Sequence, residues 1–290
     1  AWEPVNEPDY IDYAQMKRSP TYRAEFEAWI ATRDGAFNDW YFSHWREDKV
    51  RRAIDGFHAL LRDAGAEQPM VWNCNWPRML HGHEDVFRAV AASRAEAVSF
   101  CCYPGQDEVG EPFFLFSRDT SGKNYLPFLQ RCHDDEAHLG WINSDAFRDK
   151  AVTVYEFETM YNARNSYLHP AMAKLFRSLR AQMATLWTYS FSDYAPWFSG
   201  SHLFNLECTP KKAGGFRVAR EVFRNVPRGA AFACQGEADD AFGGCAFSYE
   251  LDLGAYADDG MLLHSGPLPA DFVPLPKKPH RIVGYGHSPF

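Results

Sequence analysis

The hydrophobic positions of the chain alternate between helical spacing and short continuous runs. From Val50 to Leu61, apolar residues recur every three or four positions, which predicts a helix that ends near Gly65. The following run, Met70–Trp76, has the length of a buried strand and becomes polar and aromatic at its end. A parallel strand that opens into a loop has this pattern.

The alternation of helix and strand continues along the chain. It predicts a helix at Glu84–Ser93, strands at Ala97–Tyr103 and Ala151–Glu158, a helix at Leu168–Met183, a strand at Ala184–Ser190, and a helix capped by Thr209 with Pro210 in its first turn. An irregular insertion with one short helix separates the strand at Ala97 from the strand at Ala151. Strands that alternate with helices pair in parallel through right-handed crossovers, so we predict an α/β fold.

The pattern changes after Pro227. Residues 245–251 alternate in polarity within a region rich in Gly and Ala, which predicts the start of a small β domain. Six prolines follow Gly266 and predict an extended tail. We therefore expect three parts: a main domain at 1–226, a small β segment or domain at 227–265, and a proline-rich tail at 266–290.

Composition narrows the classes of partner. The chain has 290 residues, of which 46% are hydrophobic, and its formal net charge is -8. Because nucleic-acid affinity depends on Lys and Arg that neutralise phosphates, we expect no nucleic-acid partner. No run of about 18 apolar residues occurs, so we expect no membrane span. Seven Cys exclude a complete disulfide framework. We predict mostly reduced, buried thiols, with a Cys234–Cys245 disulfide as the alternative.

Four motifs place carboxylate or aromatic side chains at the ends of predicted strands. In chain order they are Trp2-Glu3-Pro4-Val5-Asn6-Glu7-Pro8, then Tyr103, then Val152-Thr153-Val154-Tyr155-Glu156-Phe157, then Leu186-Trp187-Thr188-Tyr189-Ser190. In this order they resemble the ends of strands four, six, seven and eight in clan A glycoside hydrolases, which are retaining (β/α)8-barrel enzymes. The resemblance extends over roughly residues 1–225.

The resemblance implies a TIM barrel that this chain contains from the end of strand four onward, so we expect the chain to begin partway through the barrel. It also implies cleavage of β-glycosidic bonds by double displacement, in which Glu7 is the general acid/base and Glu156 the nucleophile. Retention requires these carboxyls to lie about 5–5.5 Å apart. Barrel closure would bring the ends of strands four and seven to one face.

The resemblance further implies the residues that bind the sugar. Asn6 would bond the hydroxyl beside the anomeric carbon, Tyr103 would contact the nucleophile, and Trp187 and Trp76 would stack on sugar rings. The implied substrate is an oligosaccharide or polysaccharide. Within the clan, Trp40–Phe42 through Arg62 and the strand ending at Asn73–Asn75 resemble family 42 enzymes, which act on β-galactosides.

Several alternatives stay open at this point. Glu158 lies two residues after Glu156, on the same face of the predicted strand, and also qualifies as the nucleophile. We prefer Glu156 because Phe157 follows it. Glu7 could instead cap a turn, and each ring could be a core residue. A non-catalytic carbohydrate-binding or scaffold remnant would keep the aromatic residues without turnover.

Other chemistries have no adequate motif. His81-Gly82-His83 lacks a full ligand set, so we predict no metal. Ser121-Gly122-Lys123-Asn124 lacks the earlier glycine of a phosphate loop, and the sequence contains neither a serine-hydrolase elbow nor a dinucleotide fingerprint. We therefore predict no cofactor.

Overall fold

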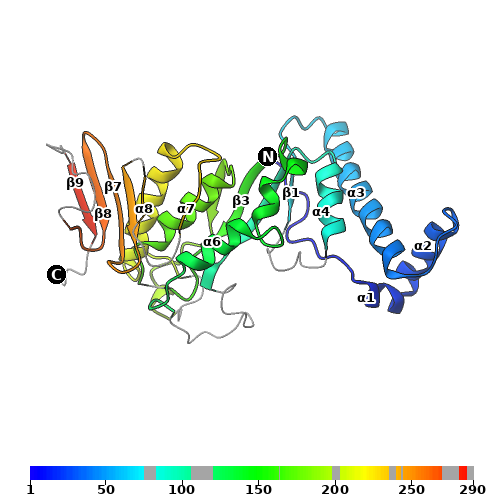
Figure 1. Ribbon diagram of the computed structural model, residues 1–290, viewed down its shortest axis with the longest axis horizontal. Helices are drawn as coiled ribbons and strands as arrows, with labels where there is room; N and C mark the ends of the chain where they lie inside the picture. Colours follow the sequence, from blue (N-terminus) through cyan, green and yellow to red (C-terminus); the bar gives the residue numbers. More distant parts are fainter. Residues whose placement is uncertain are drawn as a thin grey trace. The chain divides into compact units, whose positions relative to one another are not determined.

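The computed structural model describes residues 1–74, 83–105, 120–162, 164–197, 203–234, 240–242, 244–269 and 281–285 (Figure 1). The helices are α1 Tyr13–Arg18, α2 Pro20–Ala31, α3 Asp39–Asp63, α4 Glu84–Ala92, α6 Leu126–Asp134, α7 Leu168–Ser178 and α8 Pro210–Asn225, with short 3-10 turns at Gly140–Asn143, Asp145–Phe147 and Ala195–Trp197. The strands are β1 Val71–Asn73, β2 Ala97–Cys102, β3 Ala151–Phe157, β4 Met183–Leu186, β5 Asp240–Phe242, β6 Cys245–Ser248, β7 Leu253–Ala257, β8 Met261–Ser265 and β9 Arg281–Tyr285.

The first four strands form one parallel sheet in chain order, β1-β2-β3-β4. Val71 pairs with Ala97 and Asn73 with Ser99, so β1 and β2 are in register over the whole of β1. Helices connect the strands, as the right-handed crossover of parallel strands requires. The α/β prediction is confirmed. Within the described residues these strands do not close into a barrel, so the barrel stays a prediction.

Contacts divide the chain into two compact units, whose boundaries cut through β2 and β3. The first unit contains Ala1–Phe100 and Trp141–Thr153, and the second contains Cys101–Gly140 and Val154–Phe290.

The three N-terminal helices of the first unit share one hydrophobic cluster. Its buried residues are Met16, Phe26, Ile30, Phe42 and Trp45. The side chain of Asn38 accepts a hydrogen bond from the Tyr41 N–H at 3.0 Å and so starts α3 at Asp39, well before the predicted Val50. The sequence pattern did not predict α1 and α2.

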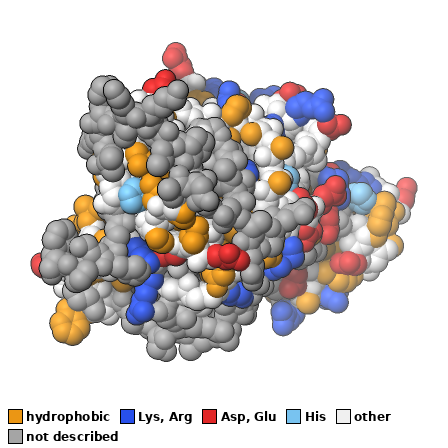
Figure 2. All heavy atoms as spheres, turned by 60° about the vertical axis from the view of Figure 1, so that its left-hand side comes forward, with side chains coloured by type: hydrophobic (Ala, Val, Ile, Leu, Met, Phe, Trp, Pro, Cys, Tyr) orange, Lys and Arg blue, Asp and Glu red, His pale blue; other side chains and the backbone are white. Residues whose placement is uncertain are grey.

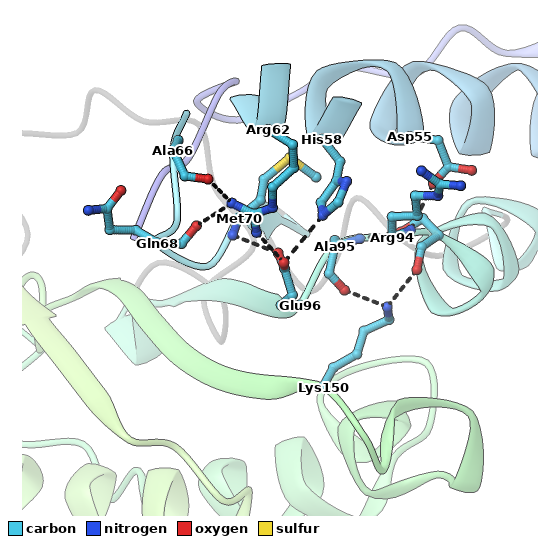
Figure 3. Close-up of polar contacts among 11 residues, drawn as sticks. Asp55, His58, Arg62, Ala66, Gln68, Met70, Arg94, Ala95, Glu96 and Lys150 are labelled. Carbon is cyan, nitrogen blue, oxygen red and sulfur yellow. Dashed lines mark hydrogen bonds and ion pairs between the residues drawn. The ribbon is translucent and has the colours of Figure 1, made fainter. Parts of the chain in front are cut away.

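Polar groups gather before the N-terminal ends of β1, β2 and β3 in this unit (Figure 3). The Glu96 carboxylate accepts hydrogen bonds from Arg62 and from the Met70 N–H, and His58 Nε2 lies 3.3 Å from it. Burial opposes ionisation of Glu96, but these bonds keep its pKa below the usual value. Lys150 donates to two backbone carbonyls just before β2. The cluster fixes the N-terminal ends of the strands.

In the second unit, α7 and α8 form a layer between β3 and the second sheet (Figure 1). Phe157 of β3 contacts Phe176 of α7 and Phe216 of α8. On the opposite side, the helices pack against β6, β7 and β8 through Ala173, Val218, Val222, Cys245, Tyr256 and Leu263. A Cβ on Gly215 would lie 2.4 Å from the Ser166 carbonyl oxygen, so only glycine allows α8 to approach this closely.

The second sheet has the order β5-β6-β7-β8-β9 and is antiparallel except between β8 and β9. Residues 281–285, which we expected in the extended tail, pair with β8 as β9. The strand expected at 245–251 ends at Ser248, because the chain turns there and Asp252 adopts a positive φ of 45°. The other domain boundaries stay predictions.

Two further boundaries differ from the sequence prediction. Helix α7 ends at Ser178, where the chain turns through Arg180 with a φ of 66°. Met183, which we expected in this helix, begins β4.

Thr209 is the residue before α8, but its hydroxyl donates to the Asn205 carbonyl and does not cap the helix.

Lys and Arg side chains are interspersed with acidic and hydrophobic ones over the described part of the face in Figure 2. No helix within the described ranges is both long enough and apolar enough to cross a membrane. All seven cysteines are thiols, and each is buried except Cys208. The Cys234–Cys245 disulfide is absent.

Candidate functional site

The C-terminal ends of β2, β3 and β4 lie side by side in the second unit. The Glu158 N–H donates to the Cys102 carbonyl at 3.3 Å, and the Trp187 N–H donates to the Phe157 carbonyl at 3.0 Å. Tyr103 is the first residue after β2, Glu156 is the penultimate residue of β3, and Trp187 is the first residue after β4. The structure therefore brings three of the predicted site residues to one edge of the sheet, where α/β proteins place ligands.

Tyr103 and Glu156 form a short hydrogen bond at this edge. The Tyr103 hydroxyl donates to Glu156 Oε2 at 2.6 Å, and both side chains are buried. Burial and the adjacent carboxylate raise the pKa of Tyr103 well above its usual value, so the phenol keeps its proton. Tyr103 thus fixes the position of one carboxylate oxygen of Glu156.

Glu158 has a different environment although it lies only two residues further on. Its carboxylate forms an ion pair with Lys212 of α8 and accepts hydrogen bonds from the Met160 N–H at 2.7 Å and the Thr159 hydroxyl at 3.1 Å. The side chain is fully buried. All these partners come from the protein, so Glu158 holds the segment that follows β3.

The charge of Lys212 outweighs burial in the electrostatics around Glu158. Burial opposes ionisation of Glu158, but the adjacent Lys212 ammonium holds the pKa of Glu158 below its usual value. His169 Nε2 lies 3.9 Å from Glu158 Oε1, and the ring is completely buried. Burial lowers the pKa of His169 to about 4, so its ring is neutral at physiological pH. Lys212 also donates to the Leu203 carbonyl at 2.6 Å.

The backbone after β3 is strained. Met160 and Tyr161 have positive φ values of 35° and 57°, which residues other than glycine rarely adopt. The hydrogen bond from the Met160 N–H to Glu158 stabilises this conformation. Such strain persists only where surrounding contacts enforce it, and it is frequent at functional sites.

Aromatic side chains are exposed after β4. Trp187 is 46% exposed, and the peptide bond that follows it is cis. Four more exposed rings follow within ten residues: Tyr189, Phe191, Tyr194 and Trp197. Exposed rings of this density offer flat apolar faces to a ligand. Trp76, the other predicted stacking residue, lies outside the described residues.

The N-terminal segment of the first unit lies beside β1. Trp2 forms a parallel bridge with Met70, with backbone hydrogen bonds of 2.8 Å to Pro69 and 2.7 Å from Val71. Glu3 accepts hydrogen bonds from buried Asn73 at 3.0 Å and buried Ser99 at 3.2 Å. The segment therefore pairs in parallel with the chain at the start of β1 through a single bridge.

Glu7 and Asn6 follow this strand position. Glu7 is half-buried and has a φ of 43°, in the left-handed region, whereas Asn6 is exposed. A glutamate pays a conformational cost for this φ, so the backbone here is held by its surroundings. Glu7 belongs to the first unit and Glu156 to the second.

Sequence reasoning missed three polar residues that organise these strand ends. Glu3 stands in the motif around Glu7, and no local pattern shows that its carboxylate meets Asn73 and Ser99. Lys212 and His169 lie in amphipathic helices, where a buried charged or titratable residue cannot be distinguished from an exposed one by spacing alone.

Comparison of the chain with models of protein families, with curated proteins and with solved structures found no match.

Proposed function

We propose that the chain is part of a retaining β-glycosidase. In this proposal the parallel sheet is a section of a (β/α)8 barrel, in which the Trp2 segment is the end of strand four and β1 to β4 are strands five to eight. Glu156 is the nucleophile and Glu7 the general acid/base. The proposal requires their carboxyls to lie about 5–5.5 Å apart.

The observation that carries the proposal is the hydrogen bond from Tyr103 to Glu156. A nucleophilic carboxylate needs a fixed orientation and one oxygen directed at the substrate. Tyr103 holds one oxygen at 2.6 Å at the C-terminal edge of the sheet. Glu158, the alternative nucleophile, forms a buried ion pair with Lys212. This difference in environment supports Glu156.

The reaction would proceed in two displacements. Glu156 attacks the anomeric carbon while the Glu7 carboxyl gives its proton to the leaving glycosidic oxygen, which breaks the carbon–oxygen bond. Glu7, now a carboxylate, takes a proton from water. That water attacks the anomeric carbon of the glycosyl ester, releases Glu156 and restores the β-configuration.

The remaining predicted residues would bind the sugar. Asn6 would bond the hydroxyl beside the anomeric carbon, where hydrogen bonds strengthen in the transition state. Trp187 would stack on a ring, since it is 46% exposed beside the end of β3. The substrate class is an oligosaccharide or polysaccharide, and β-galactosides are the first to test.

The test uses the full-length protein that contains this chain. Aryl β-glycosides are screened with Glu7→Ala and Glu156→Ala variants in the presence of azide, and Glu207→Ala is the control at an exposed carboxylate. Azide should rescue Glu156→Ala with an inverted glycosyl azide and Glu7→Ala with a retained one. Rescue by azide at neither position would overturn the assignment.

A carbohydrate-binding protein without turnover is the second candidate. The exposed rings that follow β4 favour it, because stacking needs rings and no carboxylate pair. A folded full-length protein that binds sugars equally well with and without Glu156, and hydrolyses none, would establish this function in place of the enzyme.

A further inference from the structure

A groove of about 400 Å³ lies between α2 and α3 in the first unit. One helical stripe of α3 forms one wall: Trp40, His44, Glu47, Asp48 and Arg51. The end of α2 and the turn after it form the other wall, with Trp29 and Arg33. The volume is in the range of small-molecule sites, and none of these residues takes part in the proposed chemistry.

Trp40 gives this groove an exposed aromatic surface. It is 63% exposed although it stands in the first turn of a long helix. Its ring contacts the Tyr41 ring at 4.7 Å and the His44 ring at 4.2 Å, both at steep angles. These neighbours restrict the indole and leave most of it in solvent, as a stacking platform requires.

The polar groups of the groove are fixed and nearly balanced in charge. Trp29 Nε1 donates to Asp48 at 3.1 Å, and the Arg33 guanidinium lies 4.0 Å from the centre of the Trp29 ring. The lining contains two acidic residues, Glu47 and Asp48, and two basic residues, Arg33 and Arg51. Asp48 pairs with Arg51 within α3, and Glu47 pairs with Arg88 of α4. A strongly charged ligand gains little from such a set. A neutral ligand with many hydroxyls can bond both signs.

We propose that this groove binds a neutral saccharide at a site separate from the strand ends. The Trp40 indole stacks on the apolar face of a sugar ring, and the flanking carboxylates and guanidinia bond its hydroxyls. Charge balance together with an exposed ring selects this ligand over a phosphate-bearing one. The inference does not depend on the proposed hydrolysis.

The experiment follows the indole N–H resonances of the protein by NMR while cellotetraose or a galactotetraose is added. It uses the Glu156→Gln variant, so that no sugar is consumed. The Trp40 resonance is identified as the one missing from Trp40→Ala. We expect this resonance to shift in a saturable way. We also expect Trp40→Ala, but not Trp197→Ala, to weaken binding at the groove at least tenfold.

Trp40→Phe separates stacking from folding, because it keeps a ring and should retain part of the affinity. A silent Trp40 resonance while other indoles shift would overturn the inference and leave the glycosidase proposal intact. The inference would also fail if Trp40→Ala converts a dimer to a monomer, since a second copy would then cover the groove. If the Trp40 resonance shifts but the wild-type protein hydrolyses no glycoside, the groove inference stands and only the glycosidase proposal is contradicted.

Discussion

Lys212 of α8 and Glu158 form an ion pair in which the side chains are only 1% and 0% exposed. The pair connects the segment after β3 to α8, a helix that also contacts Phe157 through Phe216. Both charged groups are shielded from water, so removing either one leaves the other buried without a counter-charge and strongly destabilises the fold. Its consequence for the site is positional: it anchors the backbone two residues beyond Glu156.

Replacing Lys212 should therefore be costly. Lys212→Met leaves the Glu158 carboxylate buried without its counter-charge, and we expect a loss of about 3–5 kcal/mol in the free energy of unfolding. Urea unfolding measures this loss. Lys211→Met is the matched control, because its partner Asp252 is partly exposed, and it should lose about 1 kcal/mol. Equal losses at the two lysines would contradict the argument.

Stability should fall as the pH drops from 6.5 to 4. His169 has a folded pKa of about 4 against 6.5 in a free chain, so the unfolded state binds the proton first. Stability from this residue is complete above pH 6.5 and decreases through the window by about 3 kcal/mol at most.

His169→Gln, which does not titrate in this window, should flatten the profile. Thermal unfolding at half-unit pH steps compares the two proteins. Parallel curves for the wild type and the variant would show that another group causes the pH dependence.

If the proposed glycosidase function holds, the hydrogen bond from Tyr103 to Glu156 should affect turnover more than folding. Tyr103→Phe removes a donor to a charged acceptor, worth about 1.5–3 kcal/mol, and we expect kcat to fall about tenfold to a hundredfold. Tyr125→Phe is the control: Tyr125 is also fully buried, but its hydroxyl donates to Thr120 at 2.6 Å. If both variants lose the same activity, the Tyr103 effect is structural.

In the first unit, the buried pair between α3 and α4 depends on the shape of arginine. Arg46 donates to both oxygens of Asp85, at 2.7 and 2.8 Å. Arg46→Lys keeps the charge but loses the two-pronged contact, and should reduce the free energy of unfolding by about 2–3 kcal/mol. Arg88→Lys, at an exposed pair with Glu47, should change it by less than about 1 kcal/mol. Denaturant unfolding of both variants checks the difference.

Local patterns predicted the elements that lie within one continuous stretch of periodic sequence. The strands around Val98 and Val154 and the helices α7 and α8 follow from apolar spacing, since burial of one face repeats with the period of the element. The parallel pairing followed from their alternation. The early start of α3 was missed because a single capping residue, Asn38, sets it.

The sequence by itself determined that carboxylates and aromatic rings stand at the ends of parallel strands. It favoured Glu156 over Glu158 only through the Phe157 that follows Glu156, because strand alternation puts both carboxylates on one face. The tertiary structure decided their environments: β3 ends at Phe157, the chain turns, and Glu158 meets Lys212 while Glu156 meets Tyr103. The hydrophobic periodicity of the sequence predicts which side chains are buried. The partner that makes burial of a charge tolerable comes from a distant part of the chain, and only folding brings it into contact.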